Sequence, residues 1–186
     1  LNKASINITD AENGSDSVAW FKPIEFDPSN FDGPYKYRLS RTFVSSGESE
    51  VVYESEATLD FLSMDTVYID QNINTEDEQF GYSIDLLWGP EERTVGKSRN
   101  ASSIYLTSAP ADNQLTLSWD VEVPWTNYEY IVYKHKTDSV DVFYELGRTT
   151  EMTFIDTGLA NLQQYRYFVK SIGNYTSGDL RDTLIK

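Results

Sequence analysis

Short segments in which apolar and polar residues alternate recur along the chain, and this period constrains the fold more than any other feature. Residues 114–120 place Leu115, Leu117 and Trp119 on one face of an extended chain. Because a period of two is typical of strands with one buried face, the pattern predicts an all-β protein with antiparallel sheets. Turn residues separate further segments of the same kind, at 128–134, 142–146 (closed by Gly147), 153–155 and 165–172.

The first half of the chain repeats the strand order of the second half. Three pairs of segments correspond, namely 35–41 with 128–134, 51–54 with 143–145, and 68–70 with 154–156. Two divergent copies of one module explain this order better than a single large domain. The sequence therefore predicts two domains, residues 1–102 and residues 103–186, joined by a short linker.

Composition excludes several classes of protein. The chain has 13 Tyr, 9 Phe and 4 Trp, which suit strands, and no Cys, so disulfides and Cys-based metal sites are excluded. The formal charge of −15 disfavours nucleic acid and anionic membrane surfaces as partners. No stretch approaches the length of about 18 apolar residues that spans a membrane, so we expect no membrane insertion.

The second half resembles a fibronectin type III domain. The resemblance rests on Trp119, on Tyr130, on the turn at 154–156, and on Leu159 with Tyr165 six residues later. In that family a Trp lies on the second strand, and the Tyr of such a Leu–Tyr pair hydrogen-bonds the loop backbone at a corner between strands. The resemblance implies an immunoglobulin-like antiparallel β-sandwich.

The first half matches the same family less closely. Trp20 and Tyr37 fit the pattern, but Phe80 stands at the corner position and has no hydroxyl. Ile73 lies seven residues before Phe80, where the family spacing is six. We expect the same fold here, with a different loop at the corner.

Three motifs of the second half, at 117–119, 130–134 and 155–159, also resemble type III repeats in surface or secreted proteins of gliding bacteria. This resemblance implies a non-catalytic adhesion or motility module of a larger extracellular or cell-surface protein. Its partner would be a protein or a polysaccharide. The alternative is a passive spacer or accessory domain, such as those of secreted carbohydrate-active enzymes.

Catalytic chemistry is difficult to assemble from this sequence. The single histidine, His135, lies between two lysines, and no Gly-x-Ser-x-Gly motif supplies a nucleophile. Carboxylate groups fall in predicted loops, where solvated charge is the simpler explanation; they are Asp60/Asp65, Glu76/Asp77/Glu78, Glu91/Glu92 and Asp138/Asp141. We therefore predict that the chain is not an enzyme.

Calcium is the one cofactor that the sequence suggests. Asp27, Asn30 and Asp32 lie in one loop, and calcium prefers several oxygen ligands on a flexible loop. Asp and Asn also favour turns for ordinary backbone reasons, so both interpretations stay open.

Two aromatic residues in loops are candidates for ligand binding. Phe31 and Trp125 each follow the second predicted strand of their domain. Aromatic rings make platforms for sugars or protein partners, although such a ring can instead fold back over the end of the sandwich.

We expect two separate unfolding transitions in scanning calorimetry, because each domain is predicted to have its own core. A single transition with equal van't Hoff and calorimetric enthalpies would contradict the two-domain prediction.

Overall fold

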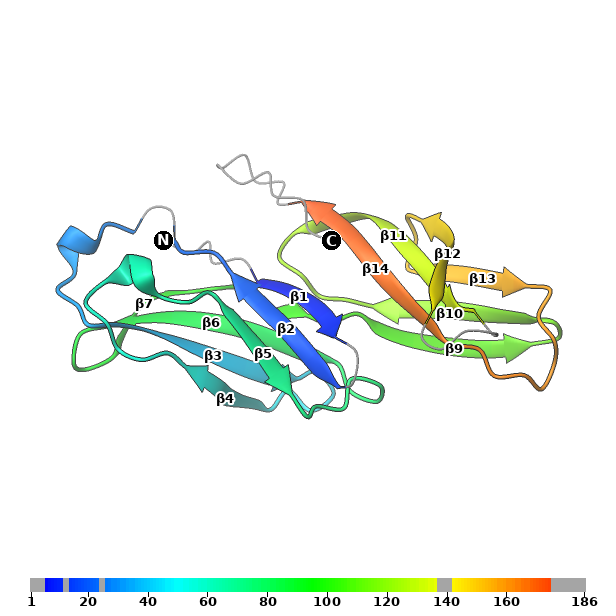
Figure 1. Cartoon of the computed structure of the whole chain (residues 1–186), viewed down its shortest axis with the longest axis horizontal. Coiled ribbons are helices and arrows are strands. Elements are labelled where there is room, and N and C mark those ends of the chain that lie inside the picture. Colours follow the sequence, from blue (N-terminus) through cyan, green and yellow to red (C-terminus); the bar gives the residue numbers. More distant parts are fainter. Residues whose placement is uncertain (1–5, 12–13, 24–25, 137–141, 175–186) are drawn as a thin grey trace. The chain divides into compact units, whose positions relative to one another are not determined.

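The computed structural model describes residues 6–11, 14–23, 26–136 and 142–174 (Figure 1). The chain forms two compact units. The first unit, here called the first module, comprises Leu1–Ser103 and Glu122–Pro124; the second module comprises Ile104–Val121 and Trp125–Lys186.

The first module contains two antiparallel sheets. One has the strand order β1-β2-β5, with β1 at Ile6–Ala11, β2 at Ser15–Trp20 and β5 at Val67–Gln71. The other has the order β4-β3-β6-β7, with β3 at Tyr35–Phe43, β4 at Ser49–Glu54, β6 at Phe80–Trp88 and β7 at Arg93–Lys97. Strand β8, at Ala101–Ser102, also pairs with β6, and two 3-10 turns occur in loops, η1 at Pro28–Asn30 and η2 at Phe61–Ser63.

The second module repeats this arrangement. Its sheets have the orders β13-β10-β9 and β12-β11-β14 in the described part of the chain. The strands are β9 (Tyr105–Ala111), β10 (Gln114–Asp120), β11 (Thr126–His135), β12 (Phe143–Thr149), β13 (Thr153–Thr157) and β14 (Tyr167–Asn174). The predicted fold class, two consecutive immunoglobulin-like antiparallel sandwiches, is confirmed.

A tryptophan from one sheet meets a tyrosine from the other in the core of each module. Trp20 and Tyr37 pack edge-to-face with ring centroids 5.5 Å apart, and Trp119 and Tyr130 do so at 5.3 Å. All four side chains are buried, as the alternating pattern predicts. Edge-to-face contacts of this kind add to the free energy gained by burying the rings.

A buried cation joins the two sheets of the first module. Arg41 of β3 places Nη1 2.8 Å from Asp70 Oδ2 of β5. The hydroxyl oxygen of Tyr82 on β6 lies 3.0 Å from the same oxygen and 2.9 Å from Asp16 Oδ2. Burial, together with these carboxylates, raises the pKa of the Tyr82 hydroxyl far above its ordinary value.

The second module contains the same contact in other residues. Lys134 Nζ lies 2.7 Å from Asp156 Oδ2, and the Tyr167 hydroxyl donates to that oxygen, also at 2.7 Å. The ammonium group lies 4.5 Å from the centroid of the Tyr165 ring, a cation–π contact. In the first module, Arg41 lies 5.3 Å from the ring of Phe80 in the corresponding position.

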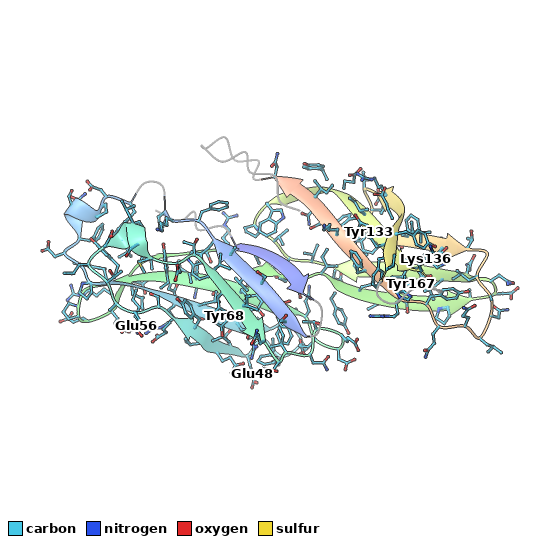
Figure 2. The ribbon with its side chains drawn as sticks, in the orientation of Figure 1. Glu48, Glu56, Tyr68, Tyr133, Lys136 and Tyr167 are labelled. Atoms are coloured by element: carbon cyan, nitrogen blue, oxygen red, sulfur yellow. The ribbon has the colours of Figure 1, made fainter. Side chains whose placement is uncertain are left out.

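Stacked tyrosines cover the edge of the first module between β4 and β5. Tyr68 of β5 is labelled in Figure 2. Its ring stacks on that of Tyr53 of β4, with centroids 4.9 Å apart and an interplanar angle of 27°. Burial raises the pKa of both hydroxyls. These two rings connect edge strands that belong to different sheets.

The corner predicted from Leu159 and Tyr165 is present. The Ala160 N–H donates to the Tyr165 hydroxyl at 2.9 Å, and the Leu159 N–H donates to the Asn113 carbonyl at 3.0 Å. The first module keeps only the second bond, from Ile73 N–H to the Gly14 carbonyl at 2.9 Å.

Glycine is required at residue 14 of that corner. Gly14 has φ of +69°, and a Cβ atom there would lie 2.4 Å from the Ile73 carbonyl oxygen. The loop before Phe80 therefore differs as expected, but it keeps the backbone hydrogen bond that ties Ile73 to Gly14.

Several strand boundaries differ from the prediction; for example, β14 begins at Tyr167 instead of residue 165. Gly147 does not end its strand but lies inside β12, opposite Val132, and a bulge shifts the register there. A Cβ atom on Gly147 would lie 2.8 Å from Phe154 Cζ, so the glycine admits the Phe154 ring.

We predict that Lys134→Met destabilises the second module by about 3–5 kcal/mol, because it leaves the buried Asp156 carboxylate without its cation. The side chains of Lys134 and Asp156 are only 11% and 7% exposed. Arg93→Met is the control, because its ion pair with Glu91 is largely exposed and should contribute less than about 1 kcal/mol. Urea unfolding measures both variants, and equal small losses would contradict the prediction.

Candidate binding site

Three loops of the first module meet at one end of its sandwich. They connect β2 to β3, β4 to β5, and β6 to β7, and comprise residues 21–34, 55–66 and 89–92. The register explains why they meet, since Tyr35 at the start of β3 pairs with Trp88 at the end of β6. Figure 1 shows η1 and η2 at this same end. We call this region the loop end.

Aromatic side chains from two of these loops and from the ends of β3 and β6 form a cluster under the loop end. Phe26 stacks on Phe31 with centroids 5.2 Å apart and lies 4.7 Å from Phe61. Phe31 meets Trp88 edge-to-face at 5.2 Å. The Tyr35 hydroxyl lies 2.6 Å from the Phe31 carbonyl oxygen, which fixes the backbone of the longest loop. The cluster gives these loops a shared apolar support.

Aspartates at the start of the two 3-10 turns hold the local backbone. Asp27 accepts hydrogen bonds from the N–H and hydroxyl of Ser29, at 3.0 and 2.7 Å, and these bonds lower the pKa of its carboxyl group. Asp60 accepts from the Leu62 N–H at 3.0 Å. Both are side-chain caps of the kind found at helix starts.

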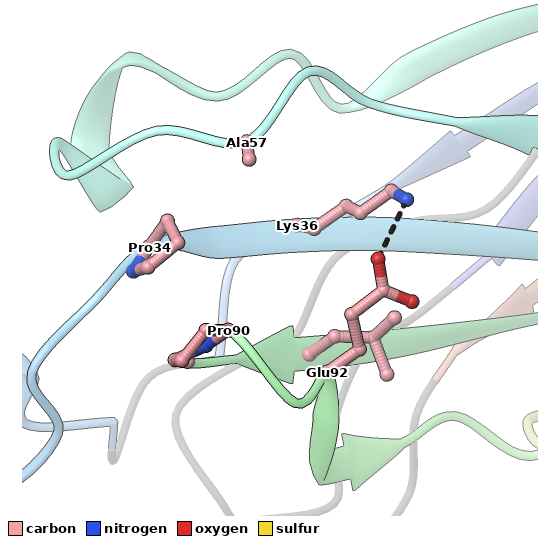
Figure 3. Close-up of a pocket in the computed structure, with 7 residues that line it drawn as sticks. Pro34, Lys36, Ala57, Pro90 and Glu92 are labelled. Atoms are coloured by element: carbon pink, nitrogen blue, oxygen red, sulfur yellow. Dashed lines mark hydrogen bonds and ion pairs between the residues drawn. The ribbon is translucent and has the colours of Figure 1, made fainter.

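A small pocket opens between the loops (Figure 3). It encloses about 160 Å³. Four lining residues are apolar, namely Pro34, Ala57, Leu87 and Pro90. Lys36 and Glu92 line the remaining wall and form an ion pair at 3.0 Å, drawn as a dashed line in Figure 3.

That charged wall is part of a larger ion-pair network. Lys36 also lies 2.6 Å from Glu54, and Arg38 contacts Glu54 at 2.5 Å and Glu92 at 2.6 Å. Its hydrogen bond to Glu54, followed by that to Glu92, raises the pKa of Lys36, and the hydrogen bond from Lys36 lowers the pKa of Glu92. Each group stays charged near neutral pH. Because each charged group has two partners, the network restrains the wall of the pocket.

Two large apolar side chains in the loop between β4 and β5 are exposed. Leu59 and Leu62 are 79% and 75% exposed. Leu59 lies against Gly33, the residue before Pro34. A Cβ atom added to Gly33 would be only 3.0 Å from Leu59 Cδ2. Apolar side chains exposed together around a pocket are typical of interaction surfaces.

Acidic residues surround this apolar area. Asp32, Glu56 and Asp65 are exposed and form no ion pair with another described residue. Glu56, labelled in Figure 2, directly precedes the lining residue Ala57. The loop end is therefore an apolar pocket with an acidic rim.

The two aromatic residues that were predicted to bind a ligand lie in different modules. Phe31 lies at the loop end, but half-buried within the aromatic cluster. Trp125 lies in the second module, where its indole N–H donates to Asn127 Oδ1 at 2.9 Å. Its ring covers Gly173, since a Cβ atom there would be 2.7 Å from Trp125 Cδ1. Both rings pack against their own module.

The predicted calcium ligands form a hydrogen-bonded turn. Asn30 Nδ2 donates to Asp27 Oδ2 at 3.0 Å, while Asp32 is exposed in the same loop. In the described part of the chain, no group of three or more His, Cys, Asp or Glu side chains is arranged to hold a metal ion. Calcium binding by these three residues stays a prediction.

Two of the other candidate pairs lie at the loop end: Asp60 and Asp65 are in the loop between β4 and β5, and Glu91 and Glu92 are in the loop between β6 and β7. His135 packs edge-to-face on Phe143 in the second module, with centroids 5.2 Å apart. Glu91 pairs with Arg93. Asp138 and Asp141 lie outside the described residues. Among the described residues, no helix is long and apolar enough to cross a membrane.

The pocket itself was not predicted. Its walls come from residues 34–36, 57 and 87–92, which no short motif connects. The one local signal is the Gly89-Pro90 pair, which is typical of a turn and lies in the loop between β6 and β7.

No protein-family model and no curated protein sequence matches the chain. Among solved structures it is similar to the FN1–FN3 domains of chicken CNTN1, with a TM-score of 0.40 and 10% identity over 100% of this chain and 67% of that chain. It is also similar to a two-domain fibronectin type III segment of chicken tenascin, with a TM-score of 0.29 and 18% identity over 94% and 93%.

Strand order decides the fold. Both modules are immunoglobulin-like antiparallel sandwiches. In the first module the three loops at the loop end are thus the connections that this fold brings together at one end of the two sheets.

We predict that Phe31→Ala destabilises the first module by roughly 1–3 kcal/mol, less than for a fully buried phenylalanine, because the cluster loses its contacts with Phe26 and Trp88. Leu59→Ala should change the free energy of unfolding by no more than about 0.5 kcal/mol, because that side chain is exposed. Thermal or urea unfolding distinguishes the two. A neutral Phe31→Ala would show that the cluster does not support the loops.

Proposed function

We propose that this chain is a non-catalytic interaction module of a larger extracellular or cell-surface protein, and that it binds a protein partner through the loop end of the first module. Fibronectin type III-like domains are commonly extracellular interaction or spacer modules. The observation that carries the proposal is the pocket at the loop end, with Leu59 and Leu62 exposed at the same end of the module.

The arrangement resembles the central part of protein–protein interfaces. Such interfaces combine an apolar centre with a polar rim, and most of their binding energy comes from a few side chains seated in pockets. Here Leu59 and Leu62 would supply apolar contact area, and the acidic residues would form the rim. An adhesion or gliding role at a bacterial surface is the finer form of this proposal, supported by the motifs of the second module.

A passive spacer is the alternative. The packing of Phe31 and Trp125 against their own modules favours it, because neither ring lies free as a platform for a ligand. A spacer would have no surface whose alteration changes binding.

The decisive experiment is selection of displayed random peptides on the purified chain, followed by binding measurements on variants. For peptides that bind the native chain, we expect the Leu59→Asp/Leu62→Asp variant to lose about tenfold or more in affinity, because it removes apolar contact and adds charge. Leu162→Asp is the matched control, since Leu162 is a fully exposed leucine in the second module.

Equal affinity for the loop-end variant and the control would contradict the proposed site. Failure to select any peptide would favour the spacer. A parallel thermal-melt screen against polysaccharides tests the other partner class, and a shift that Trp125→Ala abolishes would move the binding site to the second module.

A further inference from the structure

We propose that the pocket receives a single apolar side chain from a basic polypeptide segment. This inference rests on the proposed function and names the chemistry of the partner. Pocket size, lining and surrounding charge each support one part of it.

The volume of the pocket limits what it can hold. Sites for drug-sized ligands enclose about 300–1,000 Å³, whereas an apolar cavity of roughly 150 Å³ holds one benzene-sized ring. At about 160 Å³, this pocket suits one leucine-sized side chain. It is too small for an oligosaccharide.

The lining selects an apolar occupant. The side chains of Pro34, Ala57, Leu87 and Pro90 offer no hydrogen-bonding groups. The polar atoms of Lys36 and Glu92 already bind each other and the rest of the ion-pair network. A sugar hydroxyl in this pocket would lose its hydrogen bonds to water without replacement, which is unfavourable. An aliphatic side chain has no such cost.

The surrounding charge selects a basic segment. Asp32 and Glu56 are exposed; Glu56 directly precedes the lining residue Ala57, and Asp32 lies two residues before the lining residue Pro34. The cations of the pocket wall, Lys36 and Arg38, are paired with carboxylates, and Lys22 Nζ contacts the Leu62 carbonyl. The first 100 residues carry 19 acidic and 8 basic side chains, so the wider field is also negative. This field attracts lysine and arginine and repels acidic partners, including a second copy of this chain.

The pocket is formed before any partner arrives. The Lys36–Arg38–Glu54–Glu92 network holds one wall, and the caps at Asp27 and Asp60 hold the neighbouring turns. Binding therefore requires little ordering of the loops, which favours affinity for even a short segment.

The test is an NMR titration of the full 186-residue chain with synthetic pentapeptides that have blocked ends. The probe KKLKK should bind saturably and shift the amide resonances of Ala57 and Leu87. KKGKK should bind about tenfold or more weakly because it lacks the apolar side chain, and EELEE should not bind measurably. Raising the salt concentration from about 0.05 M to about 0.3 M should weaken the binding of KKLKK several-fold.

Three variants identify the site. Ala57→Phe places a ring over the pocket at an exposed position and should weaken binding of KKLKK about tenfold. Glu56→Lys should weaken it about threefold or more through the charge of the rim. Glu48→Lys is the control, because it makes the same charge change at the opposite end of the module (Figure 2) and should change affinity by less than about twofold. Urea unfolding confirms that each variant is folded.

Failure of this inference differs from failure of the proposed function. One outcome is that selected peptides lose affinity for the Leu59→Asp/Leu62→Asp variant but not for Ala57→Phe or Glu56→Lys. In that case the loop end is the binding site, and the proposed basic segment with an apolar side chain is the wrong partner. Tight binding of EELEE or of a polysaccharide at the same resonances would also overturn the basic, apolar partner. If no peptide responds to any change at the loop end, both proposals fail.

Discussion

A buried ion pair that crosses between the two sheets determines how each module is assembled. In the first module it joins Arg41 to Asp70, and in the second it joins Lys134 to Asp156. Such a pair is stable only when both charges have partners, and here a tyrosine hydroxyl, of Tyr82 or Tyr167, completes the carboxylate. The contact fixes the register of three strands at once, and the positions of the loops that those strands carry follow from it.

Much of the fold could be predicted because apolar and polar residues alternate along each strand, and the apolar residues face the interior. Alternation was sufficient to place Trp119 and Val132 in the core, and the spacing of Leu159 and Tyr165 was sufficient to predict the corner. The ion pairs escaped prediction because Arg41 and Lys134 stand at alternating inward positions that usually carry apolar residues. Only the three-dimensional pairing reveals the carboxylate that compensates each charge.

The candidate site was harder to predict for a different physical reason. Phe31 was correctly placed in a loop, but its ring stacks on Phe26 in the aromatic cluster under the loop end. Trp125 likewise covers Gly173. The pocket is a property of three loops that are distant in sequence, so neither periodicity nor a local motif could indicate it. Leu59 and Leu62 are exposed apolar residues in one of these loops, but exposed apolar residues such as Leu162 also occur elsewhere in the described chain.

The most direct test of binding at the loop end is amide hydrogen exchange of the full chain with and without a selected peptide. If the first module binds through this end, exchange should slow in residues 55–66 and 89–92 and stay unchanged in the second module, because bound loops open less often. Slowed exchange confined to the second module, or no change in either, would contradict binding at the loop end.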